Sequence, residues 1–365
     1  MNIFLDARFY KRSGIGRYIE GLYRGVIDYK PEIKIIAAGN GQLLSEGLFK
    51  RQMVFPFDAP VYSLSEQIEG SLLVRKFGRM ANVFHFPHYN APWFLPENSV
   101  VTVHDLTQFL FPEFFGRLRR CLAPLVLRNT LKKAGRIITV SESTAKDITD
   151  YYPEIVDKIR VIHNGISYDF KPLPEDKVIA FKKDKGVEGY IIYVGNRKPH
   201  KNIKRLIEAF SKIRIQHYNL KLIIIGEKFS DIDEVDEGID RLDLRDDIIE
   251  IERVSQEELR GYYCGAIALV HPSLYEGFGF PPLEAMACGI PVIVSNTSSL
   301  PEVCGDAAIY FDPYNVSDMI EKINLVLKNK GLRITLIEKG FNRVRSFSWQ
   351  RSVEETLHVF QEISI

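Results

Sequence analysis

The chain has 365 residues, of which 45% are hydrophobic, and its formal net charge is +1. One hydrophobic core rarely serves so long a chain, so we expect two domains. The balanced charge argues against a nucleic-acid-binding protein, and no apolar run reaches the roughly 18 residues that a membrane-spanning helix needs.

Charge and cysteine content give three further expectations. Residues 1–170 carry 22 Lys and Arg against 17 Asp and Glu, which indicates an anionic acceptor or an anionic surface. Asp6 and Arg8 come too early for a signal peptide, so we expect a cytoplasmic protein, either free or on the inner face of the membrane. We expect buried free thiols, with no disulfide and no zinc site, because no Cys-x-x-Cys spacing links Cys121, Cys264, Cys288 and Cys304.

Short apolar strands alternate with longer amphipathic helices along the chain. The predicted strands of the first half are Ile3–Leu5, Lys34–Ala38, Val83–Phe86, Val100–His104, Ile137–Val140 and Val161–His163. Those of the second half are Tyr190–Val194, Lys221–Ile225, Ile248–Ile251, Ile267–Val270 and Pro291–Val294. Helices are predicted between them, for example at Ile15–Val26, Asn202–Ile213 and Ser255–Cys264, the last with a capping box of Ser255 and Glu258.

This alternation is typical of open parallel sheets with helices on both faces. The series restarts after Ser167–Gly186, a stretch rich in Pro, Asp and Lys that we interpret as the linker. The sequence therefore predicts an α/β protein with two doubly wound, Rossmann-like domains facing a cleft. They span residues 1–170 and 171–346, and a last segment, 347–365, contains an amphipathic helix from about Trp349 to Ile363.

Ligands of open α/β sheets bind beyond the carboxyl ends of the strands. The conspicuous polar residues fall at such ends, namely Asp6 to Gly16, His104 with Asp105, Asn164 with Gly165, Gly195 to Lys201, and Glu276. Gly14 and Gly16 resemble part of a dinucleotide-binding loop, but the third glycine position holds Ile19. A nicotinamide site is therefore poorly supported, whereas a tight turn near a phosphate or an acceptor stays open.

Two loops of the second half indicate an anion site. Arg197, Lys198 and Lys201 crowd one turn before a helix, where they can bind a diphosphate without a metal, or form a solvated basic loop. Pro281 begins a short helix behind the segment Gly277, Phe278, Gly279 and Phe280, whose free N–H groups favour anions.

Glu276 and Glu284 flank that anion site, where carboxylates would repel a phosphate. They make sense if they bind hydroxyl groups on either side of the phosphates, as in a nucleoside diphosphate sugar. The alternative is a capped helix with two solvated acids.

The sequence contains only weak indications of a metal-binding site. Asp231-x-Asp233 has the spacing of metal-dependent sugar transferases, but it lies in an acidic run with interspersed cations that is typical of a solvated segment. His85-x-x-His88 has no third ligand nearby, so packing is the better interpretation. We expect no metal and no cofactor.

The donor site of glycosyltransferase family 4, whose members are retaining enzymes with the GT-B fold, resembles the stretch YEGFGFPPLEAMACGIPVIVSNTSSLPEVCGDAAIYFDP. The spacing of Glu276 and Glu284 matches the Glu-x7-Glu signature of that family. Its bacterial mannosyltransferases of O-antigen and exopolysaccharide assembly contain pieces similar, in the same order, to SGIGRY, TVHDLT, FPEFF, VSESTAKDI, HNGI and GNRKPHKN.

The resemblance implies a role for each matching position. Glu276 would hold hydroxyls of the donor sugar, Glu284 the ribose, and Lys201 the diphosphate, while the amides of Gly277 to Phe280 touch sugar and phosphates. His104 would lie beside the donor sugar. The first domain would face the acceptor, the second would bind the nucleotide sugar, and the last segment, 347–365, would cross back onto the first domain. Many members have arginine where this chain has Asn196, so the cation that partners Lys201 stays open between Arg197 and its neighbours.

The implied reaction is retaining transfer of a hexose from a nucleotide-diphosphate sugar, of the GDP-mannose or UDP-glucose type, to a glycan or lipid-linked acceptor in polysaccharide biosynthesis. A glycoside hydrolase and a non-catalytic partner that has kept the fold are the alternatives. Residues 117–136 carry seven cations and no acid. Their leucines, Leu118, Leu122, Leu125 and Leu131, either contact an anionic membrane or pack on the sheet, and Pro124 favours packing.

Overall fold

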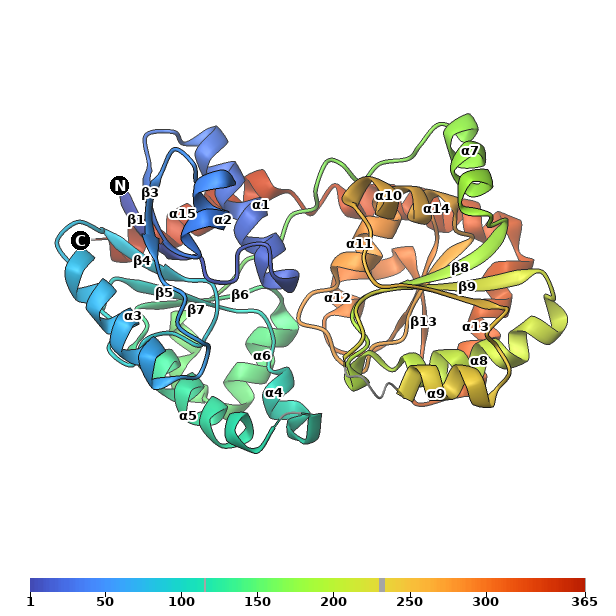
Figure 1. Ribbon diagram of the computed structural model, residues 1–365, viewed down its shortest axis with the longest axis horizontal. Coiled ribbons are helices and arrows are strands. Elements are labelled where there is room, and N and C mark those ends of the chain that lie inside the picture. Colours follow the sequence, from blue (N-terminus) through green and yellow to red (C-terminus); the bar gives the residue numbers. More distant parts are fainter. Residues whose placement is uncertain (115, 230–233, 365) are drawn as a thin grey trace. The chain divides into compact units, whose positions relative to one another are not determined.

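The computed structural model describes residues 1–114, 116–229 and 234–364. The chain divides into two compact units (Figure 1). Unit 1 comprises Met1–Gly165 together with Phe347–Ile365, and unit 2 comprises Ile166–Ser346. Within the described ranges, no helix is long and apolar enough to cross a membrane.

Each unit is built on a wholly parallel sheet. In unit 1 the strand order is β3-β2-β1-β4-β5-β6-β7. These strands are β1 (Asn2–Asp6), β2 (Lys34–Gly39), β3 (Met53–Pro56), β4 (Val83–Phe86), β5 (Ser99–Val103), β6 (Arg136–Thr139) and β7 (Ile159–Val161). In unit 2 the order is β10-β9-β8-β11-β12-β13. Here the strands are β8 (Gly189–Val194), β9 (Leu220–Ile225), β10 (Ile248–Ile251), β11 (Ala268–His271), β12 (Val292–Ser295) and β13 (Ala308–Phe311).

Helices cover both faces of each sheet (Figure 1). Those of unit 1 are α1 (Ser13–Tyr29), α2 (Gly41–Glu46), α3 (Leu64–Phe77), α4 (Thr107–Leu110), α5 (Arg117–Lys133), α6 (Glu142–Tyr151) and α15 (Trp349–Ile363). Those of unit 2 are α7 (Glu175–Lys185), α8 (Ile203–Gln216), α9 (Glu234–Arg241), α10 (Gln256–Gly265), α11 (Phe280–Ala287), α12 (Leu300–Cys304), α13 (Val316–Lys328) and α14 (Lys330–Val344).

The first strand shows why both faces need cover. Ile3 and Leu5 of β1 point to one face, where they pack with α1 and α15. Phe4 points to the other face and packs with residues of α3, α5 and α6. Alternate residues of a strand face opposite sides of the sheet, so a continuous apolar run requires a helical layer on each side. The predicted α/β architecture of two doubly wound sheets is confirmed.

The strands that the sequence did not predict are β3 and β13. β3 is an edge strand whose residues are exposed or half-buried, so it lacks the buried apolar run used to find strands. The helix starting at Ser255 is confirmed with its capping box. The last helix is confirmed as α15, which packs on unit 1, where Gly21 and Gly25 of α1 leave room for Trp349 and Val353.

The prediction that Ser167–Gly186 is only a linker was wrong, because the structure forms α7 within it. This helix has no buried residue, so it shows no apolar periodicity. Its ends nevertheless carry the signals of a helix. Glu175 and Asp176 occupy the first turn, and Gly186 ends the helix in a left-handed conformation.

The prediction of four buried thiols was also partly wrong. All four cysteines are free, and Cys288 and Cys304 are buried, but Cys264 is half-buried and Cys121 is exposed. Cys121 lies on the exposed side of α5, whereas Ala123 and Leu127 of the same helix are buried.

Candidate active site

The strand order of unit 2 reverses between β8 and β11. These are the first and fourth strands of the unit along the chain, but they lie side by side in its sheet. Such a reversal leaves an opening beyond the carboxyl ends of the two strands, and ligands of doubly wound sheets bind there. Val194 ends β8 and His271 ends β11. The loops that carry Lys201 and Glu276 follow these two residues directly.

One carboxylate oxygen of Glu276 is held by three donors. The Nζ of Lys201, the Nε2 of His271 and the Oγ of Ser273 each lie 2.7 Å from Oε1. Within the described ranges, Oε2 of Glu276 has no hydrogen-bond partner. The side chain is 12% exposed. The carboxylate is thus fixed through one oxygen, and the other remains available to a ligand.

The charge of this carboxylate is also fixed. Burial by itself would raise the pKa of Glu276, but the ammonium group of Lys201 and the hydrogen bond from His271 outweigh burial and hold that pKa well below its usual range. Glu276 is therefore ionised throughout the physiological pH range and can accept hydrogen bonds but not donate them.

Two serines hold the backbone that follows Glu276. The amide of Glu276 donates to the Oγ of Ser298 at 2.9 Å, and the Oγ of Ser299 lies 2.9 Å and 2.8 Å from the carbonyl oxygens of Glu276 and Phe278. Gly279 precedes α11 with φ +111°, where a side chain would be strained, and a Cβ there would lie 3.0 Å from Leu300. The segment Gly277–Phe280 thus reaches the helix through a fixed turn.

Lys201 lies on a short 3₁₀ turn, Pro199–Lys201, rather than on α8 itself. Asn202 joins the two with φ +59°, a left-handed conformation that asparagine tolerates. Its Nδ2 donates to the carbonyl oxygens of Pro272 at 3.0 Å and Pro313 at 2.9 Å. The lysine loop is therefore tied to the loop that carries Glu276.

No role for Asn202, His271 or Ser273 was predicted from the sequence. A signal existed for His271, because a histidine that ends a buried parallel strand lies where ligands bind. Its ring also stacks on Tyr193 of the neighbouring strand, with centroids 6.0 Å apart. The signal for Asn202 is its place between a cationic turn and a helix.

The structure does not place Arg197 as a phosphate ligand. Its guanidinium is fully buried, 3.1 Å from Asp236 and 2.5 Å from Glu250. A side chain enclosed by two acids satisfies those acids first. Arg197 therefore ties its loop to α9 and β10, and Lys201 is the cation of this loop that reaches Glu276.

Glu284 lies in α11 and is 2% exposed. Its Oε2 accepts a hydrogen bond of 2.9 Å from the hydroxyl of Tyr263 in α10. The predicted spacing does put Glu276 before the helix and Glu284 inside it, but Glu284 is the fifth residue of α11 and so lies just beyond the first turn. The alternative of two solvated acids was wrong, because both carboxylates are bound within the protein.

In unit 1, His104 and Asp105 follow β5. The ring of His104 donates from Nε2 to the carbonyl oxygen of Pro87 at 2.9 Å, and Tyr18 packs edge-on at 4.8 Å. Burial lowers the pKa of His104 to about 4 even though Asp105 favours the charged form, so the ring is neutral at pH 7. Asp105 accepts from the amide of Thr107, the first residue of α4, at 2.9 Å.

The other predicted residues of unit 1 are spread over three places. Gly14 and Gly16 lie in the first turn of α1, and a Cβ at Gly16 would lie 2.8 Å from the carbonyl oxygen of Phe9. Asn164 follows β7 and is 1% exposed. His85 is fully buried between the hydroxyls of Tyr23 and Thr102, at 2.7 Å and 2.9 Å, which confirms packing rather than metal binding.

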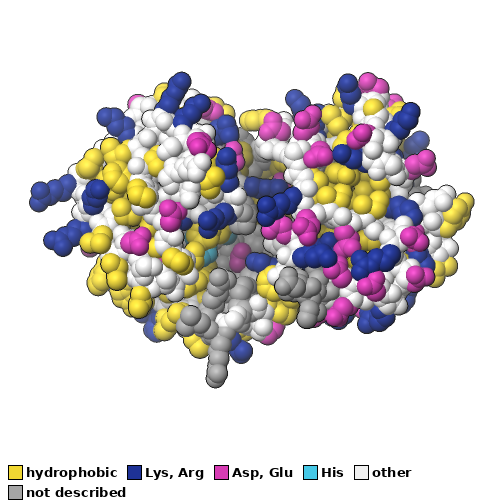
Figure 2. Space-filling model, in the orientation of Figure 1, with side chains coloured by type: hydrophobic (Ala, Val, Ile, Leu, Met, Phe, Trp, Pro, Cys, Tyr) yellow, Lys and Arg dark blue, Asp and Glu magenta, His cyan; other side chains and the backbone are white. Residues whose placement is uncertain are grey.

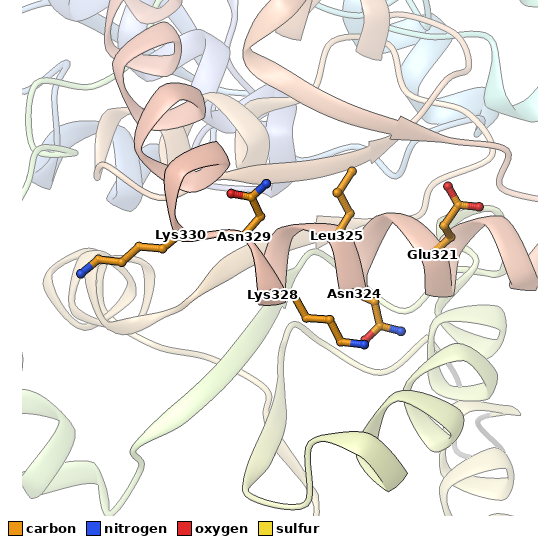
Figure 3. A pocket seen from close by; sticks show the side chains of 6 residues that line it. All are labelled: Glu321, Asn324, Leu325, Lys328, Asn329 and Lys330. Carbon is orange, nitrogen blue, oxygen red and sulfur yellow. The ribbon is translucent and has the colours of Figure 1, made fainter.

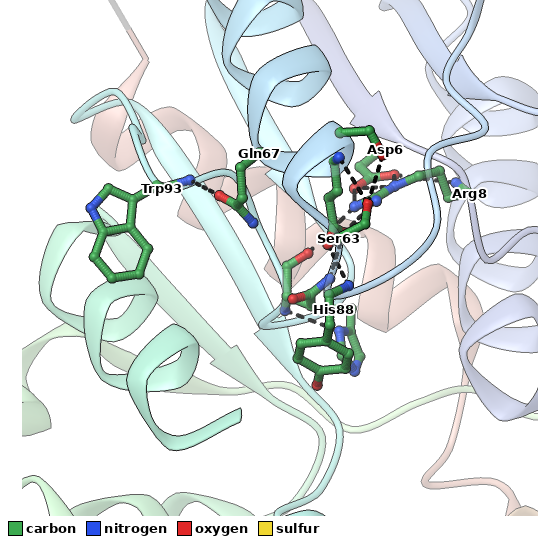
Figure 4. Close-up of polar contacts among 10 residues, drawn as sticks. Asp6, Arg8, Ser63, Gln67, His88 and Trp93 are labelled. Atoms are coloured by element: carbon green, nitrogen blue, oxygen red, sulfur yellow. Dashed lines mark hydrogen bonds and ion pairs between the residues drawn. The ribbon is translucent and has the colours of Figure 1, made fainter. Parts of the chain in front are cut away.

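A buried charge cluster lies beyond β1, near the reversal of strand order in the sheet of unit 1 (Figure 4). Arg8 binds the carboxylate of Asp6 through Nε at 2.9 Å and also pairs with Glu66 of α3. Asn90 donates to Glu66 at 2.5 Å. Burial raises the pKa of Glu66, although Arg8 opposes the shift. The cluster fixes the loops around residues 8 and 90 at the end of β1.

Within the described ranges, no three His, Cys, Asp or Glu side chains gather to hold a metal, and Asp231 and Asp233 lie outside those ranges. A groove of about 460 Å³ lies on α13 and at the start of α14 (Figure 3). None of the predicted site residues lines it. Its side chains are Glu321, Asn324, Leu325, Lys328, Asn329 and Lys330.

Two family models together match most of the chain. The model described as Glycosyltransferase Family 4 matches residues 12–170, and the model described as Glycosyl transferases group 1 matches residues 175–343. The boundary between the matches falls close to the boundary of the two units.

Curated relatives and solved structures agree with these matches. The chain is 29% identical over 362 residues to O-antigen chain mannosyltransferase B of Escherichia coli, covering 96% of this chain and 93% of that protein. It is 33% identical over 226 residues to O-antigen chain mannosyltransferase RfbU of Salmonella typhimurium strain LT2, covering 62% and 59%. Its fold is similar to HepE of Anabaena in complex with UDP and glucose, with a TM-score of 0.78, 17% identity and coverage of 98% and 99%. The chain therefore belongs to the family 4 glycosyltransferases of the GT-B fold, and it is a hexosyltransferase.

Proposed function

We propose that the protein transfers a hexose, with retention of the anomeric configuration, from a nucleotide-diphosphate sugar to a glycan or lipid-linked acceptor in polysaccharide biosynthesis. The observation that carries the proposal is the carboxylate of Glu276, fixed through Oε1 and available at Oε2. A sugar presents hydroxyl donors, and an ionised acceptor of fixed orientation binds them strongly.

Mannose is the hexose that the relatives favour, because the two curated relatives described above are both named mannosyltransferases of the O-antigen chain. A donor of the GDP-mannose type is therefore our first choice, and one of the UDP-glucose type is the second.

We propose one role for each site residue. Oε2 of Glu276 accepts from hydroxyls of the donor sugar. Lys201 carries three N–H donors and uses one on Glu276, so the others can bind the diphosphate. The amides of Gly277 to Phe280 add donors beside the phosphates. We assign Glu284, which Tyr263 holds in place, to the ribose. In unit 1, neutral His104 is the candidate for a contact with the sugar or the acceptor.

Catalysis then needs no attacking side chain. Three donors occupy Oε1 of Glu276, and an acid whose pKa lies well below its usual range is a weak nucleophile. We propose that the acceptor hydroxyl attacks on the side of the leaving group. Its proton passes to a phosphate oxygen as the glycosidic bond to the diphosphate breaks. Developing positive charge on the sugar then strengthens the contact with Glu276.

The test combines donor binding with product stereochemistry. Thermal-shift measurements with GDP-mannose, UDP-glucose and ADP-glucose should give one clear stabilising donor, because a ligand that binds the native state raises its melting temperature. NMR of the product should show the anomer of that donor. An inverted product, a sugar adduct on Glu276 in the mass spectrum, or hydrolysis that needs no nucleotide would overturn the proposal.

A further inference from the structure

Helix α3 carries an apolar stripe on its exposed side. Leu64, Ile68 and Leu72 follow each other at a spacing of four residues and are 83%, 62% and 59% exposed. Residues with this spacing lie on one face of a helix and normally face the core. Here a different face of α3, with Gly70 and Phe77, enters the core. Figure 2 shows hydrophobic side chains gathered over this part of unit 1.

The loop after β4 extends this stripe toward α5. Trp93 and Phe94 are 43% and 68% exposed. The amide of Trp93 donates to Gln67 of α3 at 2.6 Å, and Figure 4 shows the indole directed away from that contact. The carbonyl oxygen of Trp93 accepts from Asn129 and Lys133 of α5 at 3.2 Å and 2.9 Å. Helix, loop and helix thus form one connected surface of unit 1.

Cations border this surface. Helix α5 exposes Arg120, Arg128, Lys132 and Lys133, and residues 117–136 contain no acid. At the far end of α3, Arg75, Lys76 and Arg79 are exposed. Within the described ranges, Arg75, Arg79, Arg120 and Arg128 form no ion pair. The Nζ of Lys133 lies 5.8 Å and 5.2 Å from the ring centroids of Trp93 and Phe94.

The leucines of α5 contribute less than the sequence suggested. Leu131 is fully buried, Leu122 is half-buried, and Leu125 is 57% exposed. The side chain of Leu118 lies outside the described part of the structure. The packing interpretation is thus right for Leu131. The apolar part of the surface comes from α3 and from the loop at residues 93–94.

We propose that this surface, defined by Leu64, Ile68, Leu72, Trp93, Phe94 and Leu125 with the cations around them, binds an anionic lipid bilayer. Aliphatic side chains enter the edge of the hydrocarbon region, and an indole lies at the level of the headgroups. Long cationic side chains reach the lipid phosphates, each contributing about tenfold in affinity at most. A bilayer also suits a surface on which cations without acidic partners border apolar groups. A folded protein partner would need its own acids opposite them.

Vesicle co-sedimentation tests the proposal without donor or acceptor, so its outcome is independent of the proposed reaction. The protein should pellet with vesicles of equal parts phosphatidylglycerol and phosphatidylcholine and stay in solution with phosphatidylcholine alone. The variant Leu64→Ser/Ile68→Ser/Leu72→Ser should bind roughly tenfold more weakly or worse. Arg120→Gln/Arg128→Gln should lose roughly tenfold or more. Ile215→Ser is the matched control in unit 2, since Ile215 is 78% exposed, and it should bind like the wild type.

The fluorescence of Trp93 supplies a second readout, because the chain contains only two tryptophans and a change at one of them is easily detected. Its emission should shift to the blue with anionic vesicles, and Trp93→Phe should remove that shift. All changed residues are exposed, so the melting temperatures should match the wild type. Equal pelleting with both vesicle types, or wild-type pelleting by both surface variants, would overturn the proposal. So would light scattering that shows a dimer lost in the leucine variant, which would assign the surface to a second copy.

Discussion

The two oxygens of the Glu276 carboxylate have different surroundings. Three donors fix Oε1, while Oε2 remains available. Replacing the acid by glutamine keeps the shape but removes the charge and introduces an NH₂ group. Because Lys201, His271 and Ser273 already donate to one side, a glutamine must turn its carbonyl to them and its NH₂ group toward the sugar.

Glu276→Gln should therefore lower kcat roughly 10- to 100-fold and leave the affinity for the free nucleotide diphosphate unchanged. Glu284→Gln should do the reverse and weaken the nucleotide roughly tenfold through the ribose. Tyr263→Phe is the control for Glu284, since it removes the hydrogen bond of 2.9 Å but keeps the acid. Steady-state kinetics with calorimetric titration of the nucleotide separates these effects. Equal losses in kcat and in nucleotide affinity for both glutamates would contradict the assignment.

Lys201→Ala should weaken the donor sugar and the free nucleotide diphosphate by the same factor, because the proposed contact is to phosphate. The same variant also removes the ion pair of 2.7 Å with Glu276, so the pKa of that acid should rise toward its ordinary range. Lys204→Ala is the matched control, since Lys204 is exposed one turn further along the chain. A variant that binds the nucleotide diphosphate normally but the donor weakly would place Lys201 on the sugar instead.

At the scale of elements, Asn202 connects three segments. Asn202 has a left-handed backbone conformation, and its side chain donates hydrogen bonds to the carbonyl oxygens of Pro272 and Pro313. Two substitutions can separate how much each of these features contributes to the free energy of unfolding. Asn202→Gly keeps the backbone conformation and removes the two hydrogen bonds, whereas Asn202→Ala also strains the backbone by about 1 kcal/mol. Urea unfolding should therefore rank the wild type above Asn202→Gly and Asn202→Gly above Asn202→Ala. Equal stability of the two variants would show that backbone conformation has no part in holding the loop.

His85 links β4, α1 and β5, and burial lowers its pKa to about 3. The unfolded chain binds a proton at this position near pH 6.5, but the folded chain does so only near pH 3. The folded state therefore loses stability as the pH falls below about 6.5, and this loss continues to about pH 3. Between pH 7 and pH 5, His85 should account for about 2 kcal/mol of the loss.

His85→Gln removes the titration and keeps groups that can bond to Tyr23 and Thr102. Urea unfolding of wild type and variant at pH 7 and pH 5 measures the difference directly. Other titrating groups contribute to both proteins and cancel. An unchanged pH dependence in the variant would show that His85 binds a proton as readily in the folded state as in the unfolded chain.

The sequence was most informative where burial is continuous. Strands such as β8 and β9 are buried on both faces and were found from their apolar runs. β3 and α7 were not found as such, because an exposed edge strand and an exposed helix have no apolar pattern. At the site, spacing located Glu276, Lys201 and the turn at Gly279. It could not show that Arg197 is buried between Asp236 and Glu250, because those acids lie about 40 to 50 positions away and no local pattern links them.

For the whole molecule, the proposed donor carries a diphosphate, and Lys201 together with the amides of Gly277 to Phe280 can balance its negative charge. We predict that transfer survives EDTA, with Lys201 and backbone amides neutralising the diphosphate. Activity assays before and after chelation, with magnesium added back, measure this. An absolute need for a divalent cation would direct attention to Asp231 and Asp233.

Helix α15 completes unit 1 after the chain has passed through unit 2. Val353, Leu357, Val359 and Phe360 are all buried in the core that α1 shares, and each side chain stabilises by about 1.5–3 kcal/mol. Deleting residues 347–365 removes a contribution as large as the stability of a typical domain. Amide hydrogen exchange of such a truncated chain should therefore show unit 1 unprotected and unit 2 still protected. Full protection of both units would contradict this account.

Unit 2 is inserted between two parts of unit 1, and this arrangement sets the order in which the two units can complete their folds during synthesis. When a ribosome has made residues 1–346, every strand of both sheets exists, yet only unit 2 has all of its parts. The space beside Gly21 and Gly25 stays open until Trp349 and Val353 emerge from the exit tunnel. For the time needed to translate unit 2, an incomplete apolar face of unit 1 is exposed to solvent. Unit 1, most of which is translated before unit 2, therefore completes its fold after unit 2, and chaperones would meet that apolar face before α15 does.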